Sequence, residues 1–150
     1  MLPKNILVPT DLSEEATQAL EYAVELAGRL GATIHLVNVL NTPALGMPEV
    51  MTGVMIDSVV ADHRTMLDEL AQRYRTRALI GKVLLETGDA TNAITETASK
   101  LGCDLIVMGT HGRTGVSRFL LGSIAEMVVR KAPCPVLTIH THDKAEASAA

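Results

Sequence analysis

Two kinds of segment alternate along this chain of 150 residues, and the alternation constrains the fold more than any other feature. Short, continuously apolar runs rich in Val and Ile are separated by longer segments whose apolar residues recur every three or four positions. This pattern is typical of an α/β fold with an open parallel sheet and helices on both faces, because parallel strands are buried on both sides. Strands are predicted at residues 5–9, 33–40, 82–86, 104–109 and 135–140, and helices at about 13–30, 56–75, 91–101 and 123–131.

The length suits a single domain with its own core. A chain of this size buries roughly 70% of the surface that it exposes when unfolded, so it needs neither a metal nor a disulfide for stability. We expect the domain to span residues 1–141. The small and polar residues 142–150 are expected to form a disordered tail.

Composition argues against several classes of partner. The chain has two Tyr, one Phe, no Trp and a net charge of -4, which disfavours a surface for nucleic acid. Cys103 and Cys134 form no CxxC pair and are expected to be buried thiols in a reducing compartment. The first residues match no targeting peptide, and no apolar run is long enough for a membrane span. We therefore expect a cytoplasmic protein that binds neither nucleic acid nor membrane.

A glycine-rich loop follows the fourth predicted strand. The stretch MGTHGRTGVSRFLLGS, residues 108–123, contains the spacing Gly109-x2-Gly112-x9-Gly122-Ser123. Glycines between a strand and a helix N-terminus can cradle a phosphate, because the backbone approaches closely and offers unpaired N–H groups. The loop is neither a Walker A motif, since no Lys follows its glycines, nor a GxGxxG fingerprint. A branched side chain at Gly122 is expected to block phosphate and to leave the fold largely intact.

A purely structural interpretation of the same residues stays open. Ser123 and Glu126 have the spacing of a capping box, so the glycines could serve only turns and a helix cap. Asp11 could likewise cap the first helix, with Glu14 three residues later. Among the histidines, His111 is expected in an exposed turn, whereas His35 and His63 lie at apolar positions typical of core or boundary residues.

The loop and its surroundings resemble the nucleotide-binding signature of the universal stress protein family. The resemblance rests on DLIVMGTHGR at 104–113, on the glycine spacing and on IAEMVVRKAPCPVLTI at 124–139. It extends to NILVPTDLSEEATQALEYAVELA at 5–27, which is similar to the family's first strand and helix. The resemblance implies an adenine nucleotide alpha hydrolase-like sheet with strand order 3-2-1-4-5. Family members with the complete glycine signature bind ATP, so ATP, with or without magnesium, is the implied cofactor.

The resemblance also implies a set of binding residues. Asp11 would reach a ribose hydroxyl, Val39 would meet adenine through its backbone, and Met108 would pack nearby. The residues implied at the adenine and ribose are Pro9, Thr10, Asp11, Val39 and Met108. Those implied around the phosphates are Gly109, Gly112, Arg113, Gly122, Ser123 and Ile124.

The function implied is that of a regulatory ATP-binding protein of the stress response, acting through partner proteins and hydrolysing ATP slowly at most. The resemblance further implies a homodimer that pairs through the last strand. Two alternatives remain open. One is a slow ATPase, which the missing Lys and the lack of an acidic pair for magnesium disfavour. The other is an interaction module that needs no nucleotide and whose glycines are structural.

Overall fold

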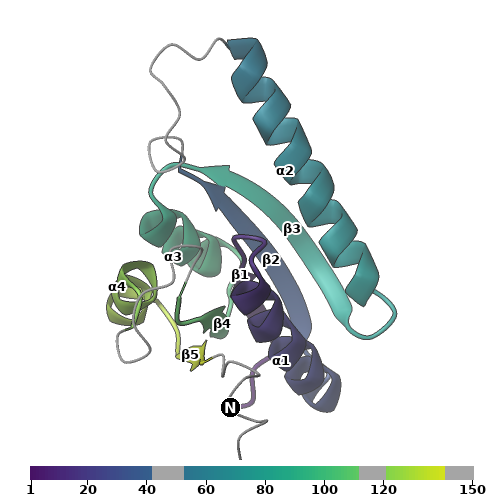
Figure 1. The fold of residues 1–150 in the computed structure, drawn as a ribbon. Helices are drawn as coiled ribbons and strands as arrows, with labels where there is room; N and C mark the ends of the chain where they lie inside the picture. Colours follow the sequence, from purple (N-terminus) through teal and green to yellow (C-terminus); the bar gives the residue numbers. More distant parts are fainter. Residues whose placement is uncertain (42–52, 112–120, 141–150) are drawn as a thin grey trace, which may run out of the picture.

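The structure is a computed structural model and describes residues 1–41, 53–111 and 121–140. Strands and helices alternate along these residues, as Figure 1 shows, and the α/β class predicted from the sequence is confirmed. The third strand and the second helix are longer than predicted. The elements are β1 (Asn5–Pro9), α1 (Glu14–Leu30), β2 (Thr33–Leu40), α2 (Gly53–Tyr74), β3 (Leu79–Thr87), α3 (Ala90–Lys100), β4 (Leu105–Gly109), α4 (Ser123–Lys131) and β5 (Val136–Ile139).

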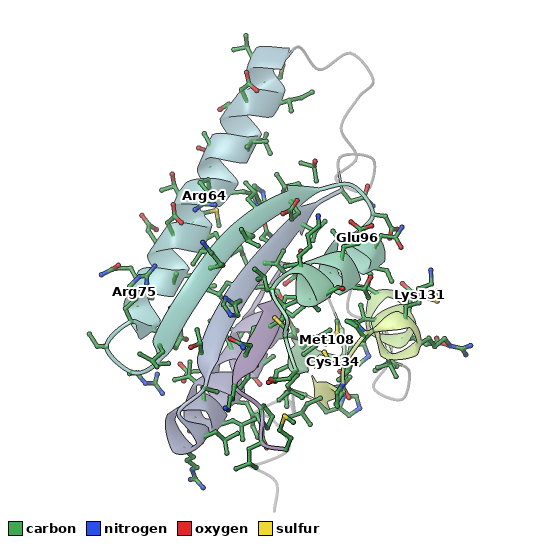
Figure 2. The ribbon with its side chains drawn as sticks, turned by 180° about the vertical axis from the view of Figure 1, so that it is seen from behind. Arg64, Arg75, Glu96, Met108, Lys131 and Cys134 are labelled. Carbon is green, nitrogen blue, oxygen red and sulfur yellow. The ribbon has the colours of Figure 1, made fainter. Side chains whose placement is uncertain are left out.

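The five strands form one parallel sheet in the order β3-β2-β1-β4-β5, which confirms the order implied by the resemblance. Side chains alternate between its two faces. Ile6 and Val8 of β1 pack with α1 and α2, whereas Leu7 packs with α3 and α4. Figure 2 shows Met108 on the second face, near Cys134. The sheet is therefore a middle layer between two pairs of helices.

Helix α2 is anchored to the edge strand β3 by two arginines. Arg64 donates to the carbonyl oxygen of Val83 at 3.1 Å, and Arg75 donates to that of Ile80 at 3.2 Å (Figure 2). Near the end of α2, the Tyr74 hydroxyl donates to Glu21 of α1 at 2.8 Å. These bonds fix the helix that carries His63. No helix in the described ranges is both long and apolar enough to cross a membrane.

His35 explains an irregularity in the pairing of β2 with β3. Its Nδ1 accepts from the backbone N–H of Lys82 at 3.0 Å, and its Nε2 lies 3.3 Å from Asn5 Oδ1. A Cβ on Gly81 would lie 2.7 Å from the ring, so only glycine leaves room for it. Burial first, and then the charge of Lys82, lower the pKa of His35. The expectation that His35 is a core or boundary residue is confirmed.

Helix α1 begins after a serine cap and not after the acid proposed from the sequence. Ser13 precedes the helix, and its Oγ accepts from the N–H of Ala16 at 3.2 Å. Asp11 instead accepts from the N–H of Ser13 at 2.9 Å and closes a turn before the helix. The interpretation of Asp11 as the helix cap is therefore wrong, because the helix starts two residues later than that role requires.

Candidate functional site

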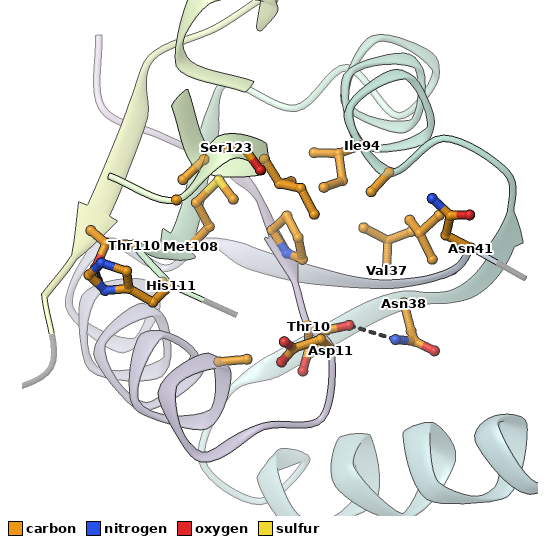
Figure 3. A pocket seen from close by; sticks show the side chains of 18 of the residues that line it. Thr10, Asp11, Val37, Asn38, Asn41, Ile94, Met108, Thr110, His111 and Ser123 are labelled. Atoms are coloured by element: carbon orange, nitrogen blue, oxygen red, sulfur yellow. Dashed lines mark hydrogen bonds between the residues drawn. The ribbon is translucent and has the colours of Figure 1, made fainter. Parts of the chain in front are cut away.

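A pocket with a volume of about 340 Å³ lies at the carboxyl ends of β1, β2 and β4. The chain passes from β1 to β2 on one side and later returns to β4 on the other, so the strand order reverses at β1. Ligands of open parallel sheets bind at such a reversal, where the loops separate. The lining residues come from the strand ends, from the helix N-termini that follow them and from α2 (Figure 3).

Every predicted site residue that the structure describes lines this pocket. Gly112 and Arg113 lie outside the described residues. Residues that are more than 100 positions apart in the chain are thus brought together at one end of the sheet. The predicted residues found in the lining are Pro9, Thr10, Asp11, Val39, Met108, Gly109, Gly122, Ser123 and Ile124.

The loop after β1 is held in a specific, strained conformation. Leu12 has a φ of 66°, in the left-handed region that residues other than glycine rarely adopt. The N–H of Leu12 donates to Thr10 Oγ1 at 3.0 Å, and the adjoining turn is closed by Asp11 Oδ1. This conformation places the Asp11 carboxylate on the pocket wall.

Asn38 and His63 belong to the site but were not predicted. Asn38, on β2, is 3% exposed, and its Nδ2 donates to the carbonyl oxygen of Thr10 at 2.7 Å (Figure 3). Its Oδ1 lies 3.3 Å from Nδ1 of His63, which α2 contributes to the pocket. An asparagine inside the apolar run TIHLVNVL is the signal that could have pointed to this contact, since a buried amide needs partners.

Val39 presents its backbone to the pocket. The pairing of β1 with β2 ends at Pro9 and Val37, and the N–H of Thr10 donates to the Val37 carbonyl at 2.9 Å. In a parallel strand, alternate residues direct their N–H and C=O to the same side. The backbone N–H and C=O of Val39 therefore point toward the β1 side of β2, as those of Val37 do. Val39, however, lies beyond the last residue of β1. Within the described residues, β1 therefore provides no partner for the N–H and C=O of Val39.

Helix α4 begins at the opposite end of the pocket, and no side chain in the described ranges caps it. Gly122 is the N-cap, and the first bond within the helix runs from Glu126 N–H to the Gly122 carbonyl at 2.9 Å. The N–H groups of Ser123, Ile124 and Ala125 precede that bond and carry the partial positive charge of a helix start. The capping box is contradicted, because Ser123 is the first helical residue and not the cap.

Gly122 is required by packing of the protein itself. Its N–H donates to the carbonyl oxygen of Thr110 at 2.7 Å, and a Cβ would lie 2.6 Å from that oxygen. Because the atom in the way is the backbone oxygen of Thr110, a side chain on Gly122 would force the backbone at Thr110 or Gly122 to move. A substitution here therefore carries a local cost in packing that the glycine spacing did not indicate, and the expectation that the fold stays largely intact remains a prediction.

Thr110 also joins two histidines at the rim of the pocket. Its Oγ1 lies 3.0 Å from Nδ1 of His111 and 2.8 Å from Nδ1 of His140, and the two rings stack with centroids 5.7 Å apart. His111 is half-buried and lines the pocket (Figure 3), so the expectation of an exposed turn position is wrong. His140 follows β5 and His111 follows β4. The two rings therefore stack because these two strands pair to their ends.

Comparison with known proteins agrees with the fold and the resemblance. A family model described as the universal stress protein family matches residues 3–140. A universal stress protein of Methanocaldococcus jannaschii is 33% identical over 147 residues, covering 92% of this chain and 82% of the relative. A putative universal stress protein of Staphylococcus haemolyticus is 37% identical over 146 residues, covering 93% of this chain and 86% of the relative.

Solved structures show the same architecture. The universal stress protein UspA of Lactobacillus plantarum superposes with a TM-score of 0.73 at 30% identity, covering 91% of this chain and 97% of that one. A universal stress protein in complex with cAMP gives 0.70 at 22% identity, covering 95% and 100%. An AMP-bound family protein of Arabidopsis thaliana gives 0.63 at 17% identity, covering 95% and 94%. With a family model matching across most of its length, this chain belongs to the universal stress protein family.

Proposed function

We propose that this protein binds ATP in the pocket at the strand ends and acts as a regulatory nucleotide-binding protein of the stress response. The observation that carries the proposal is the order of chemical groups along the pocket. A backbone donor and acceptor at Val39 beyond the end of β1, a carboxylate at Asp11 and the start of α4, which no described side chain caps, suit a base, a ribose and phosphates. In Figure 3, Thr10 and Asp11 lie close to Asn38, the neighbour of Val39, and Ser123 lies farther away across the pocket.

Adenine suits the β2 end of the pocket. Its N1 accepts a hydrogen bond and its 6-amino group donates one, which complements the N–H and C=O of Val39. Val37, Ile94 and Met108 give this cavity apolar walls, and flat heterocycles bind between such side chains. Guanine presents a donor at N1 and an acceptor at O6, so it does not complement the same backbone groups.

The other two parts of ATP are assigned by charge and hydrogen bonding. The Asp11 carboxylate is an acceptor for ribose hydroxyls, and its Oδ1 already fixes the loop around it. The N–H groups at the start of α4, with the Ser123 hydroxyl, donate to phosphate oxygens. Gly112 and Arg113 are proposed to complete the phosphate site, and a bound magnesium ion would share the phosphate charge.

The complexes with cAMP and AMP support an adenine nucleotide as the ligand. Both proteins share the fold, and their ligands have the adenine and ribose that this pocket is proposed to accept. The triphosphate is favoured here by the glycine signature between β4 and α4. Slow hydrolysis at most is proposed because no Lys follows the loop glycines.

Three measurements test the proposal. Denaturation of the purified protein should release adenine nucleotide, and ATP added to nucleotide-free protein should raise its melting temperature. Titration calorimetry should show binding of ATP in preference to GTP. Absence of released nucleotide, of a thermal shift and of binding heat would overturn the proposal. Multiple turnovers of ADP formation at an ordinary enzymatic rate would replace it with an ATPase.

We further propose a cytoplasmic homodimer that pairs through β5 and acts on partner proteins. Strand β5 is an edge of the sheet, and its residues Val136 to Ile139 are all partly exposed. An edge strand with apolar residues requires pairing or cover. Light scattering should give twice the chain mass, and Thr138→Pro should shift the mass toward the monomer, because proline removes a donor from an edge strand. A monomeric wild type would contradict the dimer.

A further inference from the structure

The amide of Asn38 is oriented by its two neighbours. The Thr10 carbonyl oxygen can only accept, so the group 2.7 Å from it must be the NH2 of Asn38. The Oδ1 of Asn38 consequently faces His63. Because Asn38 is only 3% exposed, these protein contacts and not solvent decide its orientation.

The orientation of Asn38 in turn selects one tautomer of His63. A carbonyl oxygen 3.3 Å from Nδ1 requires a proton on that nitrogen, so the neutral ring carries its hydrogen at Nδ1. Nε2 of the neutral ring is then an acceptor. In the part of the chain that the structure describes, no group pairs with Nε2. His63 therefore brings an unused acceptor to the pocket that it lines.

His63 lies at the end of the pocket that is formed by β2. His63 contacts Asn38, the residue before Val39, whereas the start of α4 lies across the pocket. The Asn38 amide makes one contact at each end and is only 3% exposed, which limits its contact with a ligand. The 6-amino group of adenine has two hydrogens, and the Val39 carbonyl uses one of them. The second requires an acceptor.

We propose that His63 is a specificity-determining residue that accepts a hydrogen bond from the 6-amino group of a bound adenine through Nε2. The inference rests on the proposed function, because it assumes that the pocket holds an adenine nucleotide. It adds a side chain from α2 to a base site otherwise made of backbone and apolar groups. A ligand with an acceptor at the 6-position would meet two acceptors and bind weakly.

A chemical double-mutant cycle tests this role. ATP is compared with purine riboside 5′-triphosphate, which lacks the amino group, by calorimetry at about pH 8. The variant His63→Asn keeps a donor for Asn38 and removes the acceptor at the Nε2 position. The preference of wild type for ATP over the analogue should exceed that of His63→Asn by about three- to tenfold, the contribution of one neutral hydrogen bond.

Two controls separate base recognition from a structural role. Asp62→Ala changes the neighbouring exposed residue of α2 and should leave the preference unchanged. In protein with 15N-labelled histidine, the Nε2 resonance of His63 should move when ATP is added and should not move when the analogue is added.

Each outcome has a defined meaning. If wild type fails to bind ATP at all, the proposed function fails. If wild type binds ATP but His63→Asn has the same preference, or loses both ligands equally, only the role of His63 is overturned. An Nε2 resonance that responds equally to both ligands would also overturn it.

Discussion

The N–H of Gly122 donates to the Thr110 carbonyl at 2.7 Å, and the place of a Cβ on Gly122 lies 2.6 Å from that same oxygen. This contact holds the start of α4 against the segment that follows β4. It sets the position of the N–H groups proposed to bind phosphate. Gly122 is therefore needed for packing before any ligand is present.

Replacing Gly122 should destabilise the protein even without nucleotide. Gly122→Ala is expected to lower the free energy of unfolding by about 1–3 kcal/mol, because the backbone must move to admit the methyl group. Gly28→Ala is the matched control, since nothing lies within 4 Å of a Cβ there and Gly28 is inside α1. The control should raise stability by about 0.5–1 kcal/mol. Urea denaturation measures both, and equal stabilities for Gly122→Ala and wild type would contradict the packing role.

A negative charge at Ser123 should separate helix stability from phosphate binding. Ser123→Asp is expected to maintain or raise stability, because an acid in the first turn interacts favourably with the helix dipole by about 0.3–1 kcal/mol. The same charge should repel phosphates and lower the affinity for ATP about tenfold or more. Adenosine should bind both proteins alike, and Ser123→Asn serves as the neutral control. Unchanged ATP affinity in Ser123→Asp would show that the phosphates bind elsewhere.

Asp11 should contribute to binding separately from its turn. Asp11→Asn retains the oxygen that accepts from Ser13, so the melting temperature without ligand should stay close to that of wild type. Affinity for ATP should fall about tenfold to a hundredfold, the range for a hydrogen bond to a charged acceptor. The 2′,3′-dideoxy analogue of ATP should bind wild type and variant equally. A loss of affinity for the dideoxy analogue as large as for ATP would contradict the ribose contact.

Stability should fall on the acid side of neutrality because of His35. The folded pKa of His35 is lowered by burial and by Lys82, so the unfolded chain binds more protons than the folded one below the ordinary value of 6.5. The stabilisation is complete above that value and is lost as the pH falls toward the folded pKa. Urea midpoints measured as the pH falls below 6.5 should decrease less in His35→Gln than in wild type. Parallel declines would show that other groups cause the acid sensitivity.

Cys103 should be unreactive in the native state. Burial, together with the nearby Cys134 and Asp104, raises its pKa to about 11. At about pH 8 only about one thiol in a thousand is then the reactive thiolate. In a Cys134→Ser variant, alkylation of Cys103 should be slow in buffer and fast in denaturant, followed by mass spectrometry. Fast alkylation of the folded protein would contradict this.

The local patterns of the chain predicted most of its elements. Continuous apolar runs marked β1, β2 and β4 to within a residue, since strands buried on both faces need apolar side chains at every position. β3 was predicted too short because its first part is an exposed edge, where Gly81 separates Leu79 and Ile80 from the apolar run that follows. The start of α2 was missed for a similar reason, because its first turns are exposed and carry no amphipathic pattern.

The predicted pocket residues came from the family resemblance, whereas the unpredicted ones depend on contacts between distant segments. Asn38 and His63 are 25 positions apart and meet only because α2 packs beside β2. His111 is half-buried and its ring stacks on that of His140, which follows β5. No single segment contains the information for either contact.

By itself the sequence determined the α/β class, the succession of strands and helices and the presence of a glycine loop before α4, because hydrophobic periodicity and glycine placement act over a few residues. Only the tertiary structure decided that Gly122 meets a backbone oxygen, which side chain His63 contacts and that Val39 lies beyond the end of β1. Each of these depends on an atom from another part of the chain: the Thr110 carbonyl, the Asn38 amide and the end of β1. Such atoms become neighbours only when the sheet has formed.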